Sequence, residues 1–186
     1  RAQRLVEQLL TLARHEHGAP PQAHARLDLG SLVRDAMVDA ATLAIGREVQ
    51  LELDATDGVC IDGDAAGIAA LVRNLVDNAI RHSPRGARVQ VTVQAQAARP
   101  GQAGALLRVD DSGPGIAAAE RERVFERFWR RGEPQAAGAD DGHGSTGSGL
   151  GLAIVRSVAE RHAARLRLAD SPLGGLRVEL EFPAAG

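Results

Sequence analysis

Hydrophobic positions spaced three or four residues apart predict five helices along this chain. In the first of them, Leu5, Leu9 and Leu12 lie on one stripe, and Gly18 ends the helix. The helices are expected over residues 1–17, 30–44, 64–82, 118–129 and 149–162, and Asp64 is expected to be the N-cap of the third.

Alternation of apolar and polar residues predicts the strands. They are expected at Leu27–Leu29, Val49–Leu53, Val59–Ile61, Val89–Val93, Leu106–Asp111, Arg165–Leu168 and Leu176–Phe182. Strands that alternate with helices in this way indicate an α/β fold, and we expect a two-layer sandwich in which helices cover one face of a mixed β-sheet.

Two segments carry neither pattern. Residues 18–26 form a polar linker with two prolines, which leaves residues 27–186 as the main domain. Residues 131–148 are mostly glycine, alanine and acidic residues, and so few apolar side chains cannot offset the entropy of ordering the segment.

Composition excludes several classes of function. The 22 basic residues are all arginine, and the absence of lysine excludes a Walker A phosphate loop and a lysine Schiff base. Any bound phosphate must therefore meet arginine, metal or backbone amides. The net charge of −2 gives no indication of nucleic acid binding.

Cysteine and histidine add little chemistry. Cys60 is the single cysteine, which makes an internal disulfide impossible and suggests a reducing compartment. The short apolar run around Cys60 predicts a buried core residue. The six histidines have no metal-ligand spacing, and no apolar run reaches the roughly 20 residues needed to span a bilayer.

Two asparagines are the first candidate site. Asn74 and Asn78 are four residues apart in a predicted helix, so both point to one side, together with Leu71. A carboxamide oxygen suits Mg²⁺ whose other ligands are anionic phosphates, and Arg81 follows within reach of such phosphates. The alternative is a pair of asparagines on a solvated helix face.

An acidic residue and a glycine loop form the second candidate. A predicted strand ends at Asp110-Asp111, and Ser112-Gly113-Pro114-Gly115-Ile116 follows, where glycine permits close approach of the backbone. The two carboxylates must face opposite ways along a strand. We choose Asp111 as the acceptor of a hydrogen bond from an adenine amine, with a purely structural turn as the alternative.

A second glycine loop, Gly147-Ser148-Gly149-Leu150-Gly151, immediately precedes a predicted helix, and free amides at a helix N-terminus can bind phosphate. Arg130 and Arg131 lie before it and could neutralise a γ-phosphate, or could be ordinary solvated charges. Phe125 and Phe128 are expected to pin this region to the core.

These stretches together resemble the motifs of sensor histidine kinases. Residues 75–84 resemble the N box, residues 111–116 the G1 box, residues 124–129 the F box and residues 147–155 the G2 box. The resemblance covers residues 27–186 and implies the catalytic ATP-binding domain with the GHKL (Bergerat) fold.

The resemblance implies ATP and Mg²⁺ as cofactors, with Asn78 as the metal ligand. It places Asn74 and Arg81 near the phosphates, His82, where relatives often have tyrosine, along the nucleotide, and a mobile lid over residues 130–148. The lid is expected to be poorly ordered at residues 132–147 without nucleotide. The implied nucleotide-binding residues are Asn74, Asn78, Arg81, His82, Asp111, Gly113, Gly115, Ile116, Arg130, Gly147, Ser148, Gly149, Leu150, Gly151 and Leu152.

Residues 1–17 resemble the end of the second helix of the dimerisation domain, in the class paired with OmpR-like response regulators. His15-Glu16 and Pro20 match the skeleton of the phosphoacceptor box, but only a linker separates them from the first strand, so we reject that reading. The chain is therefore expected to lack the phosphoacceptor histidine and to phosphorylate itself little.

The implied partners are the protein's own dimerisation domain and a response-regulator receiver domain. The chain is expected to be monomeric, as the cytoplasmic part of a homodimeric bacterial inner-membrane protein. No nucleic acid partner is expected.

Three related readings compete with the histidine kinase. An anti-sigma-factor serine kinase shares the fold but lacks a dimerisation helix such as residues 1–17. ATPases of the gyrase, Hsp90 or MutL kind use a glutamate one turn before the metal-binding asparagine, where this chain has Asn74. A pseudokinase that only binds nucleotide is the third.

Overall fold

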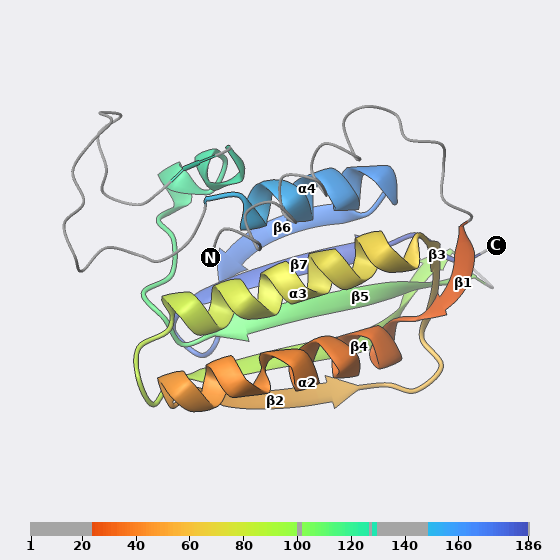
Figure 1. Ribbon diagram of the computed structural model, residues 1–186. Helices are drawn as coiled ribbons and strands as arrows, with labels where there is room; N and C mark the ends of the chain where they lie inside the picture. Colours follow the sequence, from red (N-terminus) through yellow and green to blue (C-terminus); the bar gives the residue numbers. More distant parts are fainter. Residues whose placement is uncertain (1–23, 100–101, 127, 130–148, 186) are drawn as a thin grey trace.

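In the computed structural model, which describes residues 24–99, 102–126, 128–129 and 149–185, five strands form one mixed sheet (Figure 1). Three helices lie on one face of that sheet, with α3 between α2 and α4. This arrangement confirms the predicted two-layer α/β sandwich. The order of the strands is β2-β4-β5-β7-β6; β2 runs parallel to β4, and the other pairs are antiparallel.

Three of the predicted helices and all of the predicted strands appear with shifted ends, and two of the strands are clearly longer than predicted. The helices are α2 (Leu29–Arg47), α3 (Ala65–His82) and α4 (Gly151–Arg161). The strands of the sheet are β2 (Gln50–Ala55), β4 (Arg88–Arg99), β5 (Gln102–Asp111), β6 (Arg165–Asp170) and β7 (Leu176–Phe182). The helix predicted over residues 1–17 lies outside the described residues. No helix within the described ranges is long and apolar enough to cross a membrane.

Aspartate side chains cap the N-termini of α2 and α3. The Asp64 carboxylate accepts a hydrogen bond from the Ala66 amide at 3.0 Å, which confirms the predicted N-cap of α3. The Asp28 carboxylate accepts one from the Ser31 amide at 2.6 Å, so α2 begins at Leu29. Leu29 is thus the first residue of a helix rather than the last residue of a strand, and it is fully buried.

Two short strands stand apart from the main sheet, β1 (Ala25–Asp28) and β3 (Cys60–Gly63), which pair antiparallel. Ile61 is buried in the core, and its neighbour Cys60 therefore faces the other way and is half-buried. The expectation that Cys60 is a buried core residue was wrong, because strand alternation outweighs its apolar neighbours.

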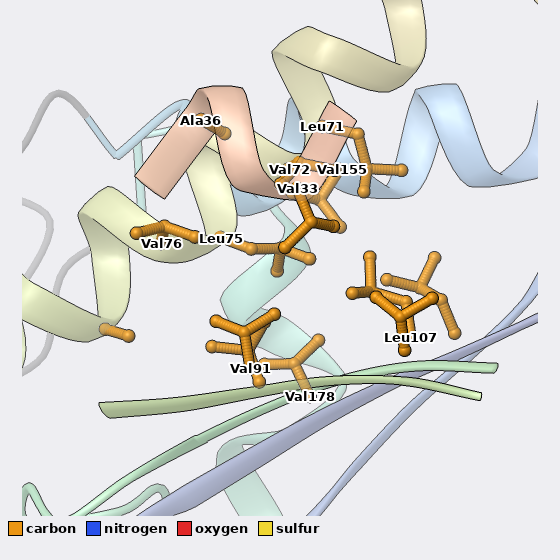
Figure 2. Close-up of a cluster of buried hydrophobic side chains, with 14 of the residues drawn as sticks. Val33, Ala36, Leu71, Val72, Leu75, Val76, Val91, Leu107, Val155 and Val178 are labelled. Atoms are coloured by element: carbon orange, nitrogen blue, oxygen red, sulfur yellow. The ribbon is translucent and has the colours of Figure 1, made fainter. Parts of the chain in front are cut away.

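A single hydrophobic core fills the space between the helices and the sheet. Figure 2 shows side chains from all three helices meeting those of the central strands. They include Val33, Ala36, Leu71, Val72, Leu75, Val76, Val155, Val91, Leu107 and Val178, all of which are buried. This packing sets the position of α3, which carries the two candidate asparagines, relative to β5, which leads into the first glycine loop.

The segment after the first glycine loop differs from the prediction. Instead of one helix over residues 118–129, the structure has two single-turn 3₁₀ helices, η1 (Ala118–Glu120) and η2 (Arg123–Phe125). Val124 is buried there, while Phe128 has φ of 62° and is 63% exposed. Phe128 therefore does not pin the segment to the core, since the change of backbone direction points its ring outward.

Candidate nucleotide-binding site

The helix α3 presents its polar residues along one edge of the core. Asn74, Asn78 and Arg81 are half-buried, and His82 at the last turn is exposed. Leu71, which was expected beside the asparagines, is fully buried in the core. The polar side of α3 is therefore narrower than the spacing of Leu71 and the two asparagines in the sequence predicted.

Asn74 connects α3 with the start of α4. Its Nδ2 donates a hydrogen bond to the Ala70 carbonyl at 2.8 Å. Its Oδ1 lies beside Gly151, where a Cβ atom would come within 3.4 Å of it. The structure thus brings Asn74 and the second glycine loop together, as a shared phosphate site requires.

Asp111 ends β5 and is buried against backbone amides. Its Oδ1 accepts hydrogen bonds from Gly113 at 2.9 Å and from Leu176 at 3.0 Å. Burial raises the pKa of Asp111, while the two amides and the nearby His82 oppose the rise. The carboxylate therefore occupies one defined orientation.

Asp110 faces the other side of the sheet, as strand alternation predicts. Arg177 donates two hydrogen bonds to Asp110, from Nε to Oδ1 at 2.9 Å and from Nη2 to Oδ2 at 3.0 Å. Asp110 is thereby engaged in a structural ion pair, and Asp111 is the carboxylate beside the glycine loop.

The first glycine loop packs against the end of α3. A Cβ atom at Gly113 would lie 2.9 Å from the His82 carbonyl oxygen and 3.0 Å from Asp111 Oδ1. Gly115 has φ of 62°, a backbone conformation that favours glycine. Ile116 is half-buried against the core, and its carbonyl accepts a hydrogen bond from Arg121 at 3.1 Å.

The second glycine loop is described from Gly149 onward. Gly149 has φ of 68°, and its carbonyl accepts a hydrogen bond from the Phe128 amide at 3.0 Å. Leu150 is fully buried, and α4 begins directly after it, with Leu152 half-buried. Arg130, Gly147, Ser148 and the expected lid over residues 130–148 lie outside the described residues.

The side chains at this site could ligate a metal ion only if a bound nucleotide supplied further ligands. Among the described residues, no group of three or more histidine, cysteine or acidic side chains could hold a metal ion. The half-buried carboxamide of Asn78 offers one neutral oxygen, so Mg²⁺ at this place would need phosphate oxygens and water for its other positions.

One contributor was not identified from the sequence. In the turn between β6 and β7, the Gly175 amide donates to the Asp111 carbonyl at 3.1 Å, and Leu176, the first residue of β7, donates its amide to the Asp111 side chain. In the sequence this turn was only a glycine-containing hairpin connection, because backbone donors carry no residue signature.

Comparisons with known proteins show the family to which the chain is similar. The family described as histidine kinase-, DNA gyrase B-, and HSP90-like ATPase matches residues 63–186. The sensor protein QseC of Salmonella typhi is 38% identical over 184 residues, which cover 98% of this chain and 37% of that protein. The sensor protein kinase PmrB of Pseudomonas aeruginosa is 34% identical over 180 residues, 96% of this chain and 35% of that protein.

A solved structure shares the fold over most of the chain. The ATP binding domain of PrrB from Mycobacterium tuberculosis superposes with a TM-score of 0.67 at 31% identity, covering 89% of this chain and all of that domain. The chain spans only about a third of the length of the curated relatives named above.

Proposed function

This chain belongs to the family of histidine kinase-, DNA gyrase B- and HSP90-like ATPases, and we propose that it is the ATP-binding catalytic domain of a bacterial sensor histidine kinase. A sensor histidine kinase transfers the γ-phosphoryl group of ATP to a histidine on a dimerisation domain, and from there the group passes to an aspartate of a response regulator. The chemistry consists mainly of positioning and charge neutralisation.

One observation carries the proposal: α3 joins the two glycine loops. Its middle contacts the start of α4 through Asn74 and Gly151, and its end contacts the first loop through His82 and Gly113. A nucleotide that lies along α3 would therefore have its base beside Asp111 and its phosphates beside the second loop.

The adenine end of the site follows from the hydrogen bonds of Asp111. Two amides occupy its Oδ1, so Oδ2 is the atom that would accept a hydrogen bond from the exocyclic amine of adenine. Guanine has a carbonyl oxygen at the equivalent position, and a carboxylate cannot donate to it. His82 and Ile116, together with Gly113 and Gly115, would frame the nucleoside.

The phosphate end would use Asn74, Arg81 and the second glycine loop, from Gly147 and Ser148 through Gly149 and Leu150 to Gly151 and Leu152, with Arg130 at the base of the lid. Asn78 would ligate the Mg²⁺ ion. Bound Mg²⁺ would neutralise charge on the phosphates and so lower the cost of phosphoryl transfer.

The position of Asn74 favours transfer to a protein over hydrolysis. An ATPase of this family would need a carboxylate base there to activate water. Asn74 has a carboxamide, and its Nδ2 donates to the Ala70 carbonyl, so it cannot remove a proton from water.

The partners follow from the same proposal. They are a dimerisation domain that carries the phosphoacceptor histidine and a response regulator, of the OmpR-like class. The chain would be a monomer, as a cytoplasmic domain of a homodimeric protein of the bacterial inner membrane, and no nucleic acid partner is proposed.

The test is a calorimetric titration of the protein with ATP and with GTP in the presence of Mg²⁺, repeated with Asp111→Asn. The expected result is binding that prefers ATP and that the substitution abolishes. Equal affinity for the two nucleotides, or no binding to either, would contradict the proposal.

A further inference from the structure

The turn between β6 and β7, residues 171–175, is held against the first glycine loop. The Gly175 amide donates to the Asp111 carbonyl at 3.1 Å, and the Leu176 amide donates to Asp111 Oδ1 at 3.0 Å. The turn is closed internally by a hydrogen bond from the Ser171 amide to the Gly175 carbonyl at 2.9 Å. The last residue of the turn thus binds the backbone of Asp111, and the first residue of β7 binds its side chain.

Gly175 leaves no room for a side chain at this contact. A Cβ atom there would lie 2.1 Å from Asp111 Oδ1 and 2.5 Å from both the Asp111 carbonyl oxygen and the Gly113 amide nitrogen. Real Cβ atoms do not approach other atoms so closely, and two of the three are backbone atoms that cannot turn aside. Any larger residue must therefore displace Asp111 or the turn.

The requirement for glycine at this position is one of space alone. Gly174, the preceding residue, has φ of 99° and an open surrounding, so it satisfies a backbone conformation. Gly175 has no positive φ and lies in the crowded contact. The turn also reaches Gly115, whose Cβ would meet the Gly175 carbonyl oxygen at 3.3 Å.

We propose that Gly175 is a specificity-determining positioning residue, which lets the β6–β7 turn hold the Asp111 carboxylate in the orientation that accepts a hydrogen bond from adenine. This inference rests on the proposed function, since it assigns the base end of the same site. The turn would then lie beside the base, next to the first glycine loop, through its contacts with Asp111 and Gly115.

The test compares Gly175→Ala with the matched control Gly46→Ala. Gly46 lies in α2 with nothing within 4 Å of its Cβ position, so its substitution adds the same methyl group without a contact. The measured quantities are the dissociation constants for Mg²⁺-ATP and Mg²⁺-GTP, together with the circular dichroism spectrum of each variant. The ratio of the two constants reports on base recognition, which a general loss of stability would not change.

We expect Gly175→Ala to remain folded, to bind ATP about tenfold or more weakly, and to lose most of its preference over GTP, because a displaced acceptor forfeits the hydrogen bond. Gly46→Ala should keep the affinities of the unsubstituted protein. A folded Gly175→Ala protein with an unchanged ratio would overturn the inference while leaving the proposed function intact. Failure of the unsubstituted protein to prefer ATP would overturn both.

A second measurement decides the matter if Gly175→Ala does not fold. In the unsubstituted protein, the amide proton resonance of Leu176 should shift when ATP binds, because the carboxylate that it contacts becomes shared with the base. GTP at the same concentration should shift it far less. A Leu176 resonance that responds equally to both nucleotides, or to neither while ATP binds, would refute the role of the turn.

Discussion

The Oδ1 atom of Asp111 accepts a hydrogen bond from the Leu176 backbone amide at 3.0 Å, although the two residues are 65 positions apart in the chain. The Gly113 amide binds the same oxygen at 2.9 Å. A carboxamide oxygen can also accept both bonds, so Asp111→Asn keeps these two contacts and replaces Oδ2, the proposed acceptor for adenine, with an amino group that only donates.

We expect Asp111→Asn to lose ATP binding without losing stability. Burial raises the pKa of Asp111, so the folded state binds the proton more tightly than the unfolded state does. The ionised carboxylate therefore lowers stability above that raised pKa, and this cost diminishes as the pH falls through it. Melting temperatures of the nucleotide-free proteins should show the variant equal to or above the unsubstituted protein at pH 7, with the difference narrowing at lower pH. A less stable variant would contradict this.

Asp110→Asn should have the opposite effect to Asp111→Asn: it should lower stability and leave ATP affinity unchanged. Asp110→Asn removes the charge that two hydrogen bonds from Arg177 engage, at a side chain that is only 3% exposed. We expect a loss of about 1–3 kcal/mol in the free energy of unfolding, because a largely covered guanidinium loses its counter-charge. Urea denaturation measures this loss, and the ATP affinity of the folded variant should be unchanged.

Stability should fall as the pH drops below neutrality because of His162. Its Nδ1 donates to the Val158 carbonyl at 2.7 Å, and its Nε2 accepts from the Asp64 amide at 3.0 Å, so the ring is neutral. Burial lowers the pKa of His162. The unfolded chain gains a proton as the pH falls through about 6.5, whereas the folded protein resists it until its lower pKa is reached.

Urea midpoints at pH 7.5, 6.5 and 5.5 test this expectation. His162→Gln should be less stable at pH 7.5 but should show a smaller decline across that range. His82→Gln leaves the contact with Asp64 intact and should decline like the unsubstituted protein. An undiminished slope in His162→Gln would assign the pH dependence to other groups.

Arg121 supports the first glycine loop from outside. Its Nε donates to the Ile116 carbonyl at 3.1 Å, and the guanidinium also pairs with Asp170 at the end of β6. Arg121→Met keeps the apolar stem but removes both interactions, and we expect ATP affinity to fall by about three- to tenfold through loss of one loop hydrogen bond.

Asp170→Asn is the matched control for Arg121. The Asp170 side chain is 87% exposed, and such surface pairs contribute little. Its ATP affinity should therefore be unchanged. An equal loss in Asp170→Asn and Arg121→Met would mean that the ion pair, rather than the bond to the Ile116 carbonyl, supports the loop.

Removal of the metal should distinguish the roles of the two asparagines. With a chelator in place of Mg²⁺, the ATP affinity of the unsubstituted protein should fall by about tenfold or more, since under the proposed function Asn78 would ligate the metal that neutralises the phosphates. Asn78→Ala should already have the weaker affinity with Mg²⁺ present and should respond little to the chelator. Asn74→Ala should still respond, and calorimetry with and without Mg²⁺ measures all three proteins.

The sequence alone determined the parts of this protein that depend on short-range order. Helical spacing and the Asp64 cap located α3 to within a residue, and alternation placed Asp110 and Asp111 on opposite faces of β5. These features follow from neighbours a few positions away, where backbone geometry and the local pattern of apolar residues decide the outcome. The order of the polar pair and the glycine loops likewise indicated the family.

Only the tertiary structure decided how the parts meet. In the folded protein Asp110 pairs with Arg177, while Asp111 binds the Leu176 amide after the β6–β7 turn. Phe128, which was expected to anchor its segment in the core, is exposed. The tertiary structure also showed that Gly175 faces Asp111 at a distance no side chain allows. Contacts between backbone atoms distant in sequence leave no local pattern, because an amide or a missing Cβ acquires its meaning only from what packs against it.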